Sequence, residues 1–321
     1  MDALDSLLKN IADEEEMLSV AKLYALSGLD RDELERVRRV WPSVAVDRRQ
    51  AIVRHLVDIS EANFEVDFGS IFRMGLGDDD AEVRAAAIDG LWEDEDVKLI
   101  PTLLRLLRGD ASEAVRAAAA TSLGHFVLAG ELDEIPAAKL EHVVETLRDV
   151  FDDDSETLDV RRRALEAIGY SSADGVADLI DEAYADDEEP MRISAVFAMG
   201  RSADSRWADQ ALAEVDSPNP EMRYEAARAC GELQNPEAVP ALAALLDDRD
   251  DQVREASVWA LGQIGGNEAR RLLTGILEDE ESDLREAAEA ALDELEFMSG
   301  SDLEFPMFDF DAEDDETDRN D

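Results

Sequence analysis

The sequence has little lysine, cysteine or histidine. Only four of its 31 basic residues are lysines, and the 321 residues include one cysteine and three histidines. A lone cysteine excludes a disulfide framework. The histidines lack the HExxH spacing of a zinc site, and no GxGxxG, P-loop or GxSxG segment is present. We therefore expect no catalytic residues, no metal site and no cofactor, and hence a protein that is not an enzyme.

Long apolar runs and a basic surface are also missing. No run approaches the ~18 apolar residues that a membrane span needs, and no basic-then-apolar leader opens the chain. Asp and Glu number 80, which gives a formal net charge of −49. A surface this acidic repels phosphate groups, which argues against nucleic-acid and membrane partners. These features predict a soluble cytoplasmic protein.

An excess of acidic residues is typical either of a disordered chain or of a folded protein from a cytoplasm with a high salt concentration. Disordered chains are poor in hydrophobic residues, whereas this chain is 45% hydrophobic and its apolar residues are regularly spaced. An Asp/Glu-rich, lysine-poor and arginine-retaining composition resembles that of extreme halophiles and indicates a halophilic archaeon as the source. Molar salt shortens the Debye length to ~3 Å, so charge repulsion no longer opposes folding. We expect circular dichroism to show loss of helicity at low salt.

Two thirds of the chain repeats one pattern, in which an apolar residue and Arg are followed by Ala and then by an apolar residue and Gly. Successive repeated arginines are 32, 45, 31, 31, 31 and 31 residues apart: Arg84, Arg116, Arg161, Arg192, Arg223, Arg254 and Arg285. Glycine stands eight residues after five of them: Gly124, Gly169, Gly200, Gly231 and Gly262. A weaker eighth copy is predicted at Arg48, with Ala51 and Leu56 in register.

Each unit is interpreted as two helices. Positions −1, +3, +4 and +7 from the repeated Arg fall on one helix face and are mostly apolar or small. We expect the glycine at +8 to end this helix as a left-handed residue, and the Asp six before the Arg to cap it. A second apolar run precedes each such helix. Two short helices cannot bury their apolar faces alone, which predicts an all-α fold of stacked helix pairs.

The unit resembles the short HEAT-like repeat of the phycobilin-lyase type, well over residues 68–297 and loosely over 30–60. The resemblance implies a right-handed α-solenoid with a period of about 31. It also implies that the repeated Arg and the Asp six before it form a ladder of charges between neighbouring units, which is a structural role.

Departures from the period divide the chain. Residues 1–29 are predicted to form N-terminal capping helices, residues 30–297 the solenoid of about eight units, and residues 298–321 an acidic tail. The 45-residue step contains an insertion near 126–139, which we expect to emerge as a loop. It is either a contact for partners or a neutral spacer.

A binding surface is predicted on the concave side, where positions +1 and +5 of each second helix are expected to face outward. Early units are small or acidic there, whereas three later units carry apolar, aromatic and Arg side chains. Such side chains are typical of protein-binding hot spots. The predicted partner-binding residues are Arg162, Arg163, Ile193, Phe197, Tyr224, Arg228 and Trp259. The alternative is that these side chains pack on one another or under the tail.

The acidic tail contains an apolar motif: Phe305, Met307, Phe308 and Phe310. It either docks into another protein or packs on its own solenoid. Cys230 occupies the apolar +7 position and is interpreted as a buried packing residue. The sequence thus favours a non-catalytic adaptor or scaffold for a protein partner that it does not identify. The alternatives are an enzyme or subunit related to bilin lyases and a regulatory subunit of a signalling or motility complex.

Overall fold

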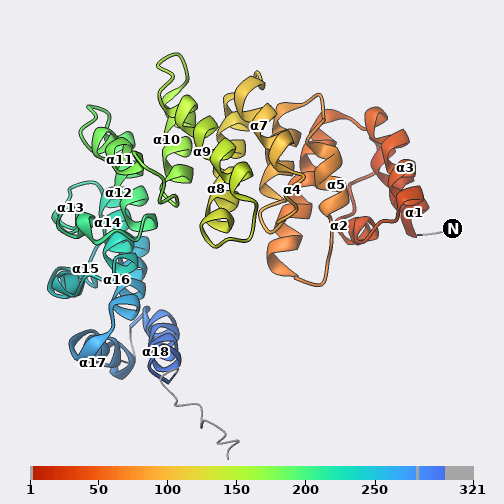
Figure 1. The fold of residues 1–321 in the computed structure, drawn as a ribbon. Coiled ribbons are helices and arrows are strands. Elements are labelled where there is room, and N and C mark those ends of the chain that lie inside the picture. Colours follow the sequence, from red (N-terminus) through yellow and green to blue (C-terminus); the bar gives the residue numbers. More distant parts are fainter. Residues whose placement is uncertain (1–2, 280–281, 301–321) are drawn as a thin grey trace, which may run out of the picture.

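The computed structural model describes residues 3–279 and 282–300, and these form eighteen α-helices and four short 3₁₀ helices without any strand (Figure 1). No helix among them is both long and apolar enough to cross a bilayer. The first nine α-helices are α1 Ala3–Ala12, α2 Val20–Leu23, α3 Arg31–Val40, α4 Val46–Ala62, α5 Gly69–Gly75, α6 Ala81–Asp89, α7 Ile100–Gly109, α8 Glu113–Glu131 and α9 Ala137–Phe151. The others are α10 Leu158–Ile168, α11 Val176–Tyr184, α12 Glu189–Arg201, α13 Ala208–Ala213, α14 Pro220–Glu232, α15 Val239–Leu245, α16 Asp251–Ile264, α17 Gly266–Glu278 and α18 Arg285–Gly300.

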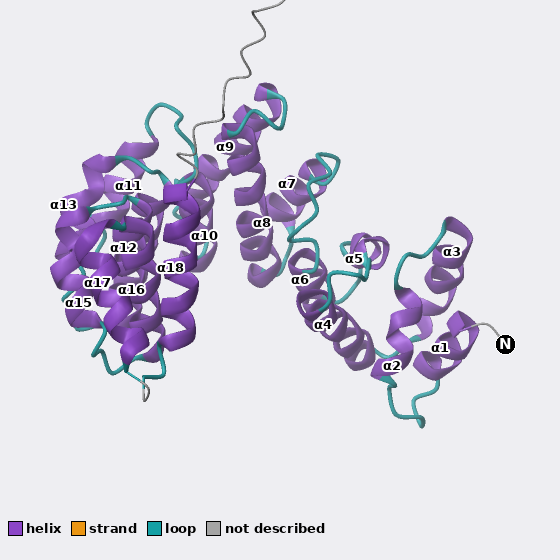
Figure 2. Ribbon diagram, turned by 90° about the horizontal axis from the view of Figure 1, so that it is seen from below, coloured by secondary structure: helices purple, strands orange, loops and turns teal. Residues whose placement is uncertain are grey.

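The helices stack as pairs into a curved α-solenoid. The second helices α4, α6, α8, α10, α12, α14, α16 and α18 each contact the next one along the row. The first helices, from α5 to α17, each pack on the second helix of their own unit. Figure 2 shows the second helices on the inner side of the curve. The concave face is therefore built from the second helices, which carry the repeated arginines.

The predicted apolar stripe forms the core of the solenoid. Positions −1, +3, +4 and +7 are buried in the second helices from α6 to α16; in α12 they are Met191, Ala195, Val196 and Met199. Residues three and four apart lie on one side of a helix, so each unit turns a continuous apolar face toward its first helix. The stripe is incomplete in α18, where Glu289 at +4 is exposed.

The prediction that the repeated glycines end their helices in a left-handed conformation is wrong. Gly200 lies within α12, and Gly169 after α10 has φ −53°. A Cβ on Gly200 would lie 2.9 Å from the Cα of Ala229, and one on Gly231 would lie 2.8 Å from the Cα of Ala260. Each alanine stands six residues after the repeated Arg of the next unit. Glycine is needed because the backbones of adjacent second helices approach too closely for a side chain.

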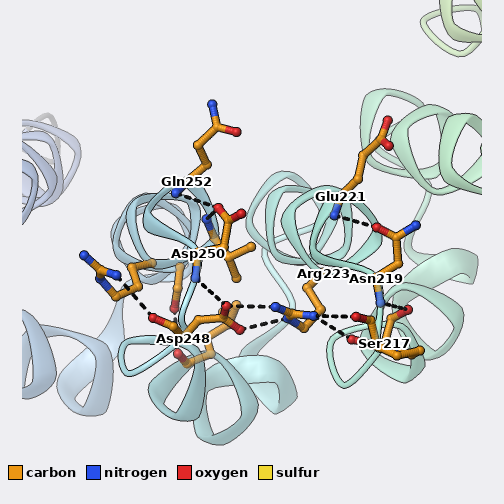
Figure 3. A network of polar contacts seen from close by, with 12 residues as sticks. Ser217, Asn219, Glu221, Arg223, Asp248, Asp250 and Gln252 are labelled. Atoms are coloured by element: carbon orange, nitrogen blue, oxygen red, sulfur yellow. Dashed lines mark hydrogen bonds and ion pairs between the residues drawn. The ribbon is translucent and has the colours of Figure 1, made fainter.

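The repeated arginines form the ladder implied by the resemblance, although not in every unit. Arg84 makes two hydrogen bonds to Asp110, of 2.8 and 2.7 Å, and Arg223 makes two of 2.8 Å to Asp248 (Figure 3). Arg116 pairs with Glu156 instead of an aspartate. Each of these arginines also donates to a carbonyl of the turn before its own helix. One guanidinium thus fixes its own turn and joins it to the next unit.

The aspartate six before the Arg does not cap the helix as predicted. The caps are residues four before the Arg: Asp80, Asn219 and Asp250. Asp248 instead accepts a hydrogen bond of 2.9 Å from the backbone N–H of Asp250, which closes the turn before the cap. Figure 3 shows both roles side by side. The carboxylate is therefore held in place before it meets the arginine of the preceding unit.

The first unit is shifted by one residue from the predicted register. Arg49, and not Arg48, joins the ladder, with its Nη1 3.2 Å from Asp78 Oδ2. Ile52 and Leu56, at +3 and +7 from Arg49, are fully buried. Arg48 instead donates to backbone carbonyls of Asn10 and Glu16. Adjacent arginines made the two registers hard to tell apart in the sequence.

The insertion near 126–139 does not emerge as the expected loop. Helix α8 continues to Glu131, and α9 begins at Ala137. Phe126 and Val127 are buried, because they extend the apolar face of α8 by helical spacing from Leu123. Gly130 lies against Leu140 of α9. The extra residues thus lengthen helices and leave a short turn between them.

The ends of the chain differ in how much the structure describes. At the N-terminal end, α1 contacts α3 and α2 contacts α4. Leu4, Leu7 and Ile11 of α1 are buried. The tail motif, comprising Phe305, Met307, Phe308 and Phe310, lies outside the described residues.

Candidate binding site on the concave face

Positions +5 and +9 of the second helices point most directly away from the core. At 100° per residue +5 lies opposite the apolar stripe, and +9 and +1 lie roughly 40° to either side of that direction. In α10, α12, α14 and α16 these outward positions bring together charged and aromatic side chains. We call this set, with Arg163 and Glu225 at +2, the concave cluster: Arg163, Glu166, Tyr170, Phe197, Arg201, Glu225, Arg228, Glu232 and Trp259.

The predicted partner-binding residues are only partly in this cluster. Phe197, Arg228, Arg163 and Trp259 belong to it and are neither fully buried nor fully exposed. Ile193 is 3% exposed, so the prediction that its side chain faces outward is wrong, because position +1 of α12 is covered by the next unit. Tyr224 and Arg162 also occupy +1; Tyr224 is half-buried against the core.

Two arginines lie over aromatic rings in the cluster. The guanidinium of Arg228 is 3.6 Å from the ring centre of Trp259 on the next helix. That of Arg201 is 4.9 Å from the ring of Phe197 and 5.6 Å from the ring of Tyr170. Cation–π contacts of this kind hold flat groups in place at a half-exposed surface. The side chains therefore pack on one another, as the alternative interpretation proposed, while part of each still faces the concave side.

Hydrogen bonds join the remaining members. Arg201 Nη1 is 2.9 Å from Glu232 Oε1, and Arg228 Nη2 is 3.5 Å from the same oxygen. Arg163 Nη1 is 2.6 Å from Glu166 Oε2. The buried hydroxyl of Ser194 donates to Glu166 and accepts from Arg162, at 2.6 and 2.9 Å. These bonds link α10, α12 and α14 across the concave face.

Glu225 is the exception in this network. It makes no hydrogen bond or ion pair with any described residue, and burial followed by the charge of Glu166 raises its pKa to about 7. Burial also raises the pKa of Glu232, although Arg201 and Arg228 oppose the rise. The cluster thus contains one carboxyl group whose charge is not compensated by a bond.

Sequence reasoning missed five members of the cluster as binding residues: Glu166, Tyr170, Arg201, Glu225 and Glu232. Glu166 lies at +5, a position that was expected from the sequence to face outward. Position +9 holds Tyr170, Arg201 and Glu232, and it lies nearly opposite the core, so helical spacing alone could have found these three. Glu225 at +2 carries no such signal.

Other reactive groups are few in the described part of the chain. Cys230 is fully buried, and burial raises the pKa of its thiol to about 12. Residues 3–279 and 282–300 contain no group of three or more His, Cys, Asp or Glu side chains placed to hold a metal ion.

Several solved structures resemble this chain in fold. YibA from Escherichia coli is 19% identical, with a TM-score of 0.47, over 88% of this chain and 99% of that one. A designed armadillo repeat protein in complex with the peptide (KR)4 is 18% identical, with a TM-score of 0.40, over 61% and 99%. Human deoxyhypusine hydroxylase in complex with glycerol is 21% identical, with a TM-score of 0.36, over 92% and 96%. A search of the curated proteins gives no significant match.

The family comparison covers both halves of the solenoid. The model for HEAT repeats matches residues 72–158 and 208–293. The two segments exceed half of the chain and include the ladder pairs Arg84–Asp110 and Arg223–Asp248. The chain belongs to the HEAT repeat family.

Proposed function

We propose that this protein is a non-catalytic scaffold that binds a segment of a partner protein on the concave cluster. The single observation that carries this proposal is the gathering of arginine and aromatic side chains over α10–α16 on a chain of net charge −49. At positions +2 and +5, α6 and α8 instead carry Ala86, Asp89, Ala118 and Thr121. Aromatic and Arg side chains supply most of the binding energy at protein interfaces.

The contacts within the cluster support a surface that is ordered before binding. Arg228 is held between Trp259 and Glu232, and Arg201 between Phe197 and Glu232. Binding to fixed side chains loses less conformational entropy than binding to mobile ones. On this proposal residues 1–29 cap the solenoid of residues 30–297, residues 298–321 form a tail, and the protein works in a cytoplasm of molar salt.

Affinity capture in molar KCl followed by mass spectrometry tests this function. The bait is the whole chain, compared with a variant carrying Trp259→Ala and Arg228→Glu. The matched control is Arg206→Glu, because Arg206 also lies over a tryptophan, Trp207, at 5.9 Å, but outside the cluster. We expect partners of the wild type and the control to be lost from the double variant, with the melting temperature checked for all three. Capture of the same partners by all three would refute the concave cluster as the binding surface.

A further inference from the structure

The lengthened end of α8 leaves apolar side chains uncovered at the edge of the solenoid. The second helices on either side of α8, α6 and α10, end at Asp89 and Ile168, soon after their repeated Arg, whereas α8 continues to Glu131. No second helix therefore covers the α6 side of the α8 extension. Leu128 and Leu132 are 40% and 61% exposed there.

A groove lies between this helix end and the turn that follows α6. It has a volume of about 800 Å³, and we call it the edge groove. Its floor includes the buried Phe126 and Ile135, and its walls carry Leu128, Leu132 and Trp92, the last 45% exposed. A neighbouring hollow shares Trp92 and adds Phe64, which is 80% exposed. Exposed apolar side chains that gather in a groove and are rimmed by polar residues are a feature of interaction sites.

The rim of the edge groove is acidic. Glu93, Asp94, Glu95 and Glu134 line it together with His125, and no Lys or Arg is among its lining residues. Asp94 is paired with Arg73, whereas Glu93, Glu95 and Glu134 make no ion pair with any described residue. Burial lowers the pKa of His125 and so favours its neutral form. The rim thus presents uncompensated negative charge around an apolar floor.

We propose that the edge groove binds an amphipathic helix of a partner protein whose apolar face is flanked by Lys or Arg. Apolar anchors three and four residues apart would enter between Trp92 and Leu132, while the basic flanks meet the carboxylates of the rim. The groove offers side chains and no strand edge, so the bound segment must satisfy its own backbone hydrogen bonds, as a helix does. This site is separate from the concave cluster and does not depend on the function proposed for it.

Charge also argues against the two occupants that this chain itself offers. Residues 301–321 include ten acidic residues and one basic residue, so the tail would bring like charge to the rim. A second copy would bring its own acidic rim and a net charge of −49. Like charges placed together oppose association.

Fluorescence anisotropy with a labelled synthetic peptide tests the proposal on the whole chain. The probe is a short peptide of Leu and Lys with Leu at helical spacing. Its two controls are a scrambled peptide of the same composition and a peptide with Glu in place of Lys. Measurements use the lowest salt concentration at which circular dichroism shows full helicity. We expect the helical Leu–Lys peptide to bind at least about tenfold more tightly than either control.

The variant Leu128→Ser with Leu132→Ser should weaken that binding about tenfold or more. Its matched control is Met17→Ser with Val20→Ser, which removes exposed apolar side chains elsewhere and should bind as the wild type does. The variant in Trp259 and Arg228 should also bind normally. The proposal would be overturned if the Leu128→Ser, Leu132→Ser variant bound the Leu–Lys peptide as tightly as the wild type does. It would also be overturned if the wild type bound the Leu–Glu peptide as tightly as the Leu–Lys peptide. Displacement by a peptide of residues 301–314, or a dimer that the groove variant abolishes, would overturn it in favour of the tail or a second copy.

Discussion

The units near the two ends of the solenoid are joined by the arginine ladder, whereas those around α12 are joined across the concave face. Ladder pairs link Arg49 to Asp78, Arg84 to Asp110 and Arg116 to Glu156, and they resume with Arg223 and Asp248. Between these stretches Arg192 donates only to carbonyls of its own turn. In the next unit Ser217 stands where most units carry Asp.

The concave contacts replace the ladder at this gap. Arg162 bonds to Ser194 of the next unit and lies 3.7 Å from Glu221 of the unit after it, and Arg201 bonds to Glu232. A ladder pair serves only structure, whereas Arg201 and Glu232 also belong to the concave cluster that we propose for binding. Ligand binding and the joining of units would therefore involve the same residues around α12. The units of α4 and α6, which are joined by the ladder, contribute no residue to the concave cluster and would be indifferent to the ligand.

The largest effect is expected from removing a ladder carboxylate. Asp248→Ala would leave the guanidinium of Arg223, which is 16% exposed, without its partner and would open the turn before α16. We expect a loss of about 2–4 kcal/mol in the free energy of unfolding, measured by urea titration. The matched control is Asp204→Ala, which removes a similar turn bond and a pair with an arginine that is 58% exposed. A control that destabilises as much as Asp248→Ala would show that turn closure, and not the ladder, is what matters.

A smaller change in the free energy of unfolding, this time a gain, is expected from a substitution in the concave cluster. The pKa of Glu225 in the folded protein, about 7, exceeds its ordinary value of 4.5. The folded state therefore binds more protons between these values, and the contribution of Glu225 to stability falls as pH rises from 4.5 to 7. Glu225→Gln should then stabilise the protein by on the order of 1–2 kcal/mol near pH 8, and by much less near pH 4.5.

Thermal unfolding at both pH values measures this difference. Glu255→Gln, an exposed glutamate on α16, serves as the control and should show no pH-dependent gain. A gain for Glu225→Gln that is the same at both pH values would contradict an uncompensated carboxyl group. The ladder behaves in the opposite way, because the hydrogen bond from Arg223 lowers the pKa of Asp248. That contribution is lost only as pH falls below about 4.

The sequence predicted the repeat and its apolar stripe because both depend on helical spacing within one unit. Contacts between units were harder to predict. The glycine at +8 has a local explanation as a helix end, and only the structure shows Gly200 against Ala229. Likewise, the exposure of Leu128 and Leu132 depends on where α6 ends, which no spacing within α8 reveals. The sequence placed the outward-facing side chains at +1 and +5, whereas in α12 the side chain at +1, Ile193, is buried and those at +5 and +9 are partly exposed.

The smallest change in the free energy of unfolding is expected from restoring the ladder at its gap around α12. Ser217→Asp should give Arg192 the carboxylate that Asp248 gives Arg223, since both positions precede the next repeated Arg by six residues. We expect a gain of about 0.5–1 kcal/mol in urea unfolding, which shrinks in molar KCl because salt screens the pair. Ser217→Asn, which keeps the turn bond to the N–H of Asn219 but adds no charge, should give no such gain. If both substitutions act alike, charge is not what the gap lacks, and the concave contacts alone set the geometry around α12.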